Sequence, residues 1–163
     1  MIVLNFGNNR VYRNLFVEKK MASEAYLFVR DHLNRLESSL FTVTLDLESV
    51  ADVVEHNEFE NEVLVELAAR LLTWLPVFPK RESLLFTLSA FLCKSVDWSE
   101  FDFQLLLDVL PDLQVLELHH ALFILGSSFN ADYVPILESY LTHANEGVRG
   151  SAEDALTELR YTP

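Results

Sequence analysis

Residues 142–159 read THANEGVRGSAEDALTEL, and their apolar positions recur at the spacing of one helix face. These positions are Val148, Ala152, Ala155, Leu156 and Leu159. Asn145 is a suitable N-cap residue for this helix. Gly147 and Gly150 fall in the first turn, where glycine costs less helix stability than in the middle. Because the buried stripe contains two alanines and the first turn two glycines, we expect the preceding helix to cross close by.

Residues 132–159, DYVPILESYLTHANEGVRGSAEDALTEL, resemble a HEAT-type repeat. The first helix of that repeat carries a proline near its start, here Pro135, and the second carries a valine-arginine pair, here Val148 and Arg149. In that family the arginine bonds to an acid or a carbonyl in the turns, so the resemblance implies a structural role for Arg149. Shifted by 34 residues, Ala121 aligns with Ala155. The resemblance is good over about 112–160, loose over 46–111, and does not cover 1–45.

The resemblance implies a mainly α fold, a short right-handed α-α superhelix of antiparallel helix pairs. Apolar periodicity independently predicts helices over about 60–75, 81–94, 99–110, 112–125, 131–143 and 146–160. Short loops between them favour antiparallel packing. At the third helix, Ser99 and Asp102 have the spacing of a capping box, and Trp98 and Phe103 that of a hydrophobic staple. In this family the second helices of successive pairs form a broad concave surface.

The first 45 residues follow different patterns. Residues 1–17 fit a β-hairpin with a glycine-containing turn, 20–37 fit a helix, and 40–47 alternate with the period of a strand. The competing interpretation is that 45–56 forms the first helix of the array. We therefore expect one domain over 1–163, with 1–45 as an N-terminal cap and 46–163 as a helical-repeat body.

Charge is distributed unevenly along the 163 residues, whose net charge is -13. Residues 1–35 hold six Lys/Arg and three Asp/Glu, whereas 36–163 hold six Lys/Arg and 22 Asp/Glu. A surface of one sign repels nucleic acid, so direct DNA or RNA binding is not expected. The same surface attracts a cationic protein and accelerates its encounter with the chain.

Neither catalytic nor metal-binding patterns stand out, and we expect no enzyme activity, metal or cofactor. The nearest set of ligands is Glu117, His119 and His120, but adjacent helical histidines point about 100° apart and cannot share an ion. Cys93 is the single cysteine and lies in the apolar run LSAFLC, where a buried thiol is expected. A single cysteine, no signal-peptide pattern and no membrane-spanning run fit a cytoplasmic protein without membrane contact.

A loose overall resemblance to small acidic helical immunity proteins of bacterial contact-dependent growth inhibition systems implies a specific function. Such a protein would neutralise a basic, nuclease-type toxin by covering its active site. The residues expected to contact the partner are Glu58, Glu62 and Glu66 on one helix face, Asp112 and Glu117 nearer the C-terminus, and Trp98 or Tyr133 as aromatic anchors. The alternatives are a HEAT-like protein-protein adaptor and a helical-repeat lyase that attaches pigments to proteins.

Overall fold

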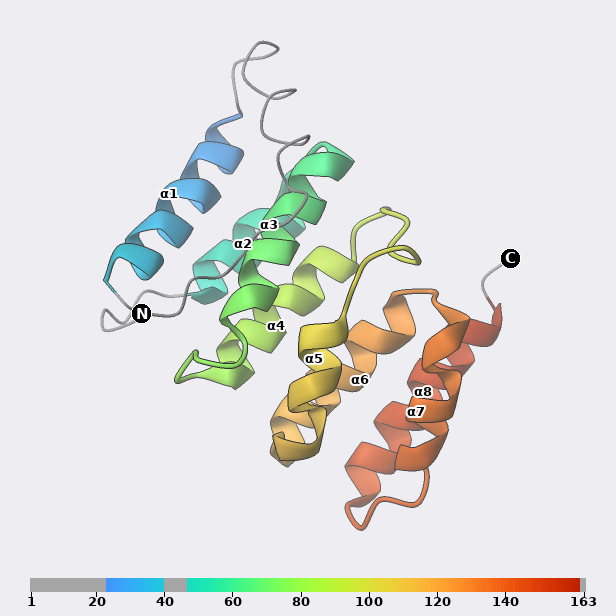
Figure 1. Ribbon diagram of the computed structural model, residues 1–163. Helices are drawn as coiled ribbons and strands as arrows, with labels where there is room; N and C mark the ends of the chain where they lie inside the picture. The colour runs from blue at the N-terminus through green and yellow to red at the C-terminus, as the bar shows by residue number, and fades with distance from the viewer. Residues whose placement is uncertain (1–22, 40–46, 162–163) are drawn as a thin grey trace.

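The computed structural model describes residues 23–39 and 47–161, which form eight α-helices, two 3₁₀-helices and no strand (Figure 1). The α-helices are α1 (Glu24–Ser38), α2 (Leu47–His56), α3 (Asn61–Trp74), α4 (Arg81–Leu92), α5 (Gln104–Val109), α6 (Val115–Ser127), α7 (Val134–Tyr140) and α8 (Glu146–Tyr161). The 3₁₀-helices are η1 (Leu110–Asp112) and η2 (Ala131–Tyr133). The predicted mainly α class is confirmed.

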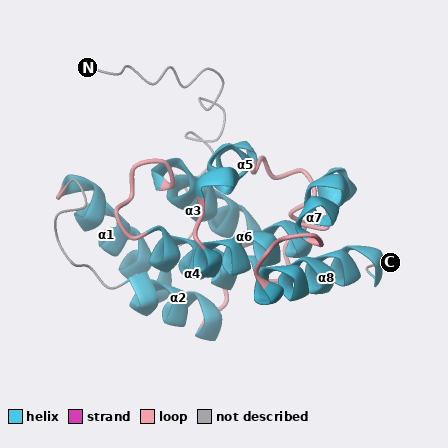
Figure 2. Cartoon of the chain, turned by 90° about the horizontal axis from the view of Figure 1, so that it is seen from below, coloured by secondary structure: helices cyan, strands magenta, loops and turns pink. Residues whose placement is uncertain are grey.

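The helices lie in two layers. Figure 2 shows α2, α4, α6 and α8 side by side in one layer, covered by α1, α3, α5 and α7 in the other. The most extensive contacts join neighbours within the first of these layers, and α7 packs on α8, α3 on α4 and α1 on α2. This succession of packed helix pairs is compatible with a helical-repeat fold. We call the layer of α2, α4, α6 and α8 the second-helix layer.

One apolar cluster runs through the described residues from Val29 of α1 to Leu156 of α8. Its centre is supplied by α4 and α6, because each of them is covered by a neighbour on both sides within the layer. The hydroxyl of Thr87 is fully buried there and has two acceptors for its one proton, the carbonyl oxygen of Ser83 in its own helix at 2.9 Å and that of Leu47 at 3.1 Å; the bond to Leu47 is the one between helices. This bond satisfies a polar group in the core and connects the start of α2 to α4.

Two predictions about the N-terminal region have different outcomes. The helix expected over 20–37 is α1, and the alternative helix over 45–56 is α2. The predicted hairpin over 1–17 lies outside the described residues, as does the strand over 40–47 except for Leu47, the first residue of α2.

The helix predicted from Ser99 begins later than expected, at Gln104. The reason is a local turn, in which the amide and hydroxyl of Ser99 both donate to Asp97 Oδ1, at 3.0 and 2.7 Å. These two bonds lower the pKa of the Asp97 carboxyl. The amide of Gln104 then donates to Asp102 Oδ1 at 2.8 Å. Ser99 is therefore not a helix cap, and the aspartates on either side of it organise the turn.

Gly126 lies at a close approach of two helices, a role that the sequence suggested for Gly147 and Gly150. A Cβ atom added to Gly126 of α6 would lie 2.7 Å from the Cα atom of Ala155 in α8. A Cβ on Gly147 would lie 3.0 Å from the ring of His119, which belongs to α6 and not to the preceding helix. A Cβ on Gly150 would meet no atom within 4 Å beyond its chain neighbours and the backbone of its own helix. The close approach at Ala155 is therefore made by α6 and not by the preceding helix α7 as expected, and Gly126 makes it possible.

Gly126→Ala and Gly150→Ala form a matched pair that tests this packing. We expect Gly126→Ala to lower the free energy of unfolding by about 2 kcal/mol, because a backbone would have to move. We expect Gly150→Ala to raise it by about 0.5–1 kcal/mol, because alanine favours a helix interior and meets open space. Urea denaturation of both variants measures the two changes. Equal effects of the two substitutions would show that α6 and α8 do not approach as closely as described.

Candidate protein-binding surface

Three basic side chains of the helical body bind backbone carbonyls at the ends of helices. Arg149 donates to the carbonyl oxygens of His143 and Ala144, at 2.8 and 3.2 Å. This confirms its predicted structural role. Lys94 Nζ donates to the carbonyl oxygen of Glu55 at 2.7 Å, and the Arg81 guanidinium to that of Leu75 at 3.2 Å. Carbonyls at helix C-termini lack partners within the helix, so these cations complete the turns that connect the helices.

The C-terminal half consequently carries a strong negative field. Residues 95–159 contain twelve Asp/Glu and a single arginine or lysine, Arg149. Its guanidinium is occupied by the two carbonyls. Among the described residues, ion pairs join Arg30 to Asp31, His56 to Asp52 and Arg70 to Glu37 in the N-terminal half. A cationic partner would therefore meet a surface on which carboxylates outnumber basic side chains.

The five acidic residues predicted to contact a partner lie on several elements. Glu62 and Glu66 are exposed on α3. Glu58 is exposed in the loop before that helix, so the prediction that all three residues lie on one helix face is wrong for Glu58. Asp112 is exposed in η1. Glu117 is half-buried at the start of α6, where its Oε2 accepts from the amide of Gln114 at 2.8 Å. Glu117 therefore caps a helix as well as contributing charge.

The two predicted aromatic anchors belong to the core. Trp98 is fully buried, and its ring meets that of Phe101 edge-on, with centroids 5.4 Å apart. Tyr133 is buried against Phe103, with ring centroids 6.2 Å apart. Among the described residues, the indole Nε1 of Trp98 is the buried side-chain polar atom that finds no hydrogen-bond partner. Neither aromatic ring is available to a partner, because both are buried, and Tyr133 connects η2 to Phe103.

Half of the exposed large apolar side chains of the described residues lie elsewhere, on two adjacent helices of the second-helix layer. Phe86 of α4 is 40% exposed, and Leu116 and Phe123 of α6 are 58% and 41% exposed. The sequence carried a signal for them, because Phe86 and Phe123 fall outside the apolar stripe that buries the rest of each helix. Large apolar residues that a helix does not bury are candidates for contact with another molecule.

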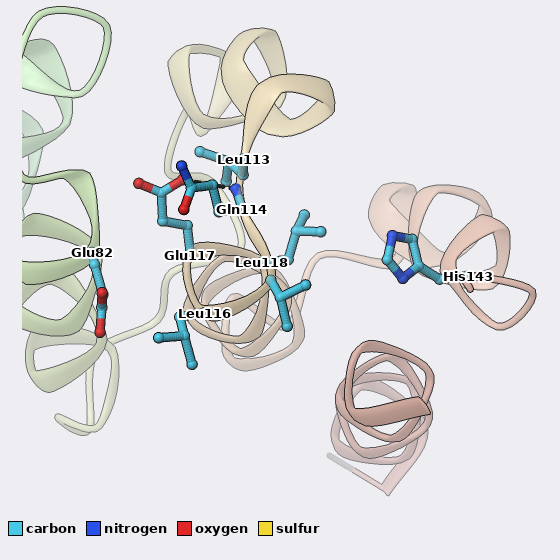
Figure 3. A pocket seen from close by; sticks show the side chains of 8 residues that line it. Glu82, Leu113, Gln114, Leu116, Glu117, Leu118 and His143 are labelled. Atoms are coloured by element: carbon cyan, nitrogen blue, oxygen red, sulfur yellow. Dashed lines mark hydrogen bonds between the residues drawn. The ribbon is translucent and has the colours of Figure 1, made fainter. Parts of the chain in front are cut away.

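A shallow hollow of about 470 Å³ adjoins these residues at the N-terminal end of α6. In Figure 3, Glu82 of α4 lies opposite Leu116 and Glu117 of α6, and His143 lies on the other side of that helix end. The hollow is lined by Glu82, Leu113, Gln114, Val115, Leu116, Glu117, Leu118 and His143. Its exposed rim thus combines apolar side chains with two carboxylates.

The histidines of the same region make contacts within the fold. His119 Nδ1 lies 2.6 Å from the hydroxyl of Ser151, and His120 packs against Phe86. Across the described residues, no group of three His, Cys, Asp or Glu side chains is placed to hold an ion. Cys93 is exposed at the end of α4, not buried as expected, since it follows the last buried turn. Partial burial and Glu55 raise the pKa of its thiol, although Lys94 opposes them.

Comparisons with protein-family models, with curated proteins and with solved structures give no match for this chain. None of the described helices is long and apolar enough to cross a membrane. What the surface does must therefore be inferred from its own geometry.

His120 provides a pH test of this region. Burial lowers the pKa of His120, Glu82 opposes that effect, and His119 adds to it. In the unfolded chain His120 should bind a proton near pH 6.5, whereas in the folded chain it binds one only at lower pH. Protonation therefore favours the unfolded chain, and the free energy of unfolding falls as the pH drops below about 6.5. We expect His120→Gln to make this decline shallower between about pH 7.5 and about pH 5 in urea denaturation.

The exposed His56 is the control for that experiment. His56→Gln removes a histidine that pairs with Asp52 at 3.3 Å on the surface, and it should not make the decline shallower. Identical declines for the wild-type chain and His120→Gln would contradict the assignment of His120.

Proposed function

We propose that this chain is a non-catalytic binding protein whose partner is a basic protein. One observation carries the proposal: residues 95–159 contain twelve Asp/Glu and a single arginine or lysine, Arg149, so this half of the chain keeps a strong negative field. Such a field raises the rate at which an oppositely charged protein finds its site. The half of the chain with this field also contains the exposed apolar residues of α6, which supply contact area.

The specific function that we propose is that of an immunity protein. The chain would bind a basic, nuclease-type toxin and cover its active site with an acidic surface. A nuclease active site attracts phosphate, so an acidic protein can occupy it by charge complementarity and exclude nucleic acid by its bulk. This rests on the acidic surface and on the resemblance to small acidic helical immunity proteins. The alternative is an adaptor that uses the same helical layers to connect two cellular proteins.

The proposal is tested by isolating the partner from the organism that makes this chain. The affinity-tagged chain is recovered with its partner, and the association rate of the purified pair is measured by stopped flow. We expect the rate constant to fall about tenfold or more between about 50 mM and about 500 mM salt, because salt screens the attraction. The immunity function further predicts that the partner alone stops growth and that co-expression of the chain restores it.

Charge-neutralised variants give the control. Glu62→Gln combined with Glu66→Gln and Asp112→Asn should slow the association at low salt. Glu24→Gln, at the start of α1 and far along the chain from the acidic half, should change it little. A partner without an excess of lysine and arginine, or a rate constant unaffected by salt, would refute the proposal. If the partner does not stop growth, or if co-expression of the chain does not restore it, the immunity function is refuted and the adaptor alternative is favoured.

A further inference from the structure

We infer that the outer side of α4 and α6 is the surface on which the partner docks, and that it receives a basic amphipathic helix of that partner. This inference rests on the proposed function and adds the place and form of the contact. We call this surface the docking face, and define it by Phe86, Leu116, His120 and Phe123, with Glu82 and Glu117 at one end.

The docking face is continuous across two helices. Leu116, His120 and Phe123 follow one another at i, i+4 and i+7, so they lie along one side of α6. The ring of His120 meets that of Phe86 edge-on, with centroids 5.8 Å apart. Glu82 precedes Phe86 by one turn of α4 and interacts electrostatically with His120. The contacts between α4 and α6 therefore bring both stripes into a single surface.

The exposure of these residues is not explained by folding. Phe86, Leu116 and Phe123 are among the eight large apolar side chains that are exposed in the described residues, and Val115 adjoins them on α6. Half of the eight thus lie on two neighbouring helices. Protein-binding surfaces combine a centre of large apolar side chains with a polar rim that remains in contact with water. The docking face has that composition.

The negative charge at the rim of the docking face favours a partner segment that carries lysine or arginine. Helix α6 contains no lysine or arginine, and Arg81 at the start of α4 is held by carbonyls at the end of α3. Glu82 and Glu117 lie next to Leu116 on the hollow shown in Figure 3. A helix with leucine or aromatic residues on one side and lysine or arginine on the flanks would place its apolar side on Phe86 and Phe123. Its cations would then reach the two glutamates.

A second copy of this chain fits the docking face less well. An isologous contact would bring Glu82 and Glu117 of one copy near the same residues of the other, and each copy has a net charge of -13. Like charges at the rim of an interface oppose association. A basic segment meets no such opposition, so charge favours it over self-association.

The test uses the full chain and a defined probe, a peptide of about 14 leucine and lysine residues in an amphipathic helical pattern. A peptide with glutamate in place of every lysine is the charge control. Fluorescence anisotropy measures the dissociation constant of each peptide. We expect the lysine peptide to bind at least about tenfold more tightly than the glutamate peptide at low salt.

Paired variants then locate the peptide. We expect Phe86→Ser with Phe123→Ser to weaken binding of the lysine peptide about tenfold or more. Phe28→Ser with Val77→Ser removes apolar side chains that are 39% and 68% exposed on other parts of the chain, and it should change binding less than about twofold. Glu82→Lys leaves the buried core intact and should also weaken binding, which keeps the test decisive if a double variant unfolds.

Three results would overturn the inference. These are equal weakening by the two double variants, unchanged binding by Glu82→Lys, and self-association of the wild-type chain that Phe86→Ser with Phe123→Ser abolishes. The last result would assign the face to a second copy. If the native partner bound the Phe86→Ser, Phe123→Ser variant unchanged and still with a salt-dependent rate, this inference would fail while the proposed function stood. Loss of the salt dependence in the wild-type chain would instead refute the proposed function.

Discussion

The contact between Gly126 of α6 and Ala155 of α8 sets the spacing on which the second-helix layer depends. Two helix backbones meet there with no room for a single added carbon atom. Because interiors are packed as densely as organic crystals, a change at this point would be transmitted to the neighbouring helices. The position of α6 in turn determines where His120 and Phe123 lie relative to α4. The candidate binding surface is thus a consequence of how tightly the C-terminal helices pack.

Much of the fold could be predicted from the sequence, because its decisive signals are local. The caps and turns of α8 are one case: Asn145 accepts from the amide of Val148, and Arg149 bonds the preceding carbonyls, as the pattern indicated. The apolar periodicity likewise located α3, α4 and α8 to within a few residues. The start of α5 was missed because Asp97 and Asp102, rather than Ser99, organise the preceding turn.

The candidate site was less predictable, because exposure depends on contacts between distant segments. Trp98 looked like a surface anchor, yet it is fully buried against Phe101, in a series of ring contacts that continues through Phe103 to Tyr133. Glu62 and Asp112 are exposed as expected, but helix packing places them on separate elements. Phe86 and Phe123 are the reverse case, because each is an apolar residue outside the buried stripe of its helix and is exposed. This pattern becomes informative only when α4 and α6 are known to be neighbours.

Arg149, Lys94 and Arg81 bind carbonyl oxygens, so the turns that they hold do not depend on the charge of surface carboxylates. A salt bridge breaks when acid protonates its carboxylate, but a carbonyl oxygen takes up no proton over the ordinary pH range. The bonds of Arg149, Lys94 and Arg81 therefore outlast acidification. The surface charge can change without releasing the inter-helix turns that these three residues anchor.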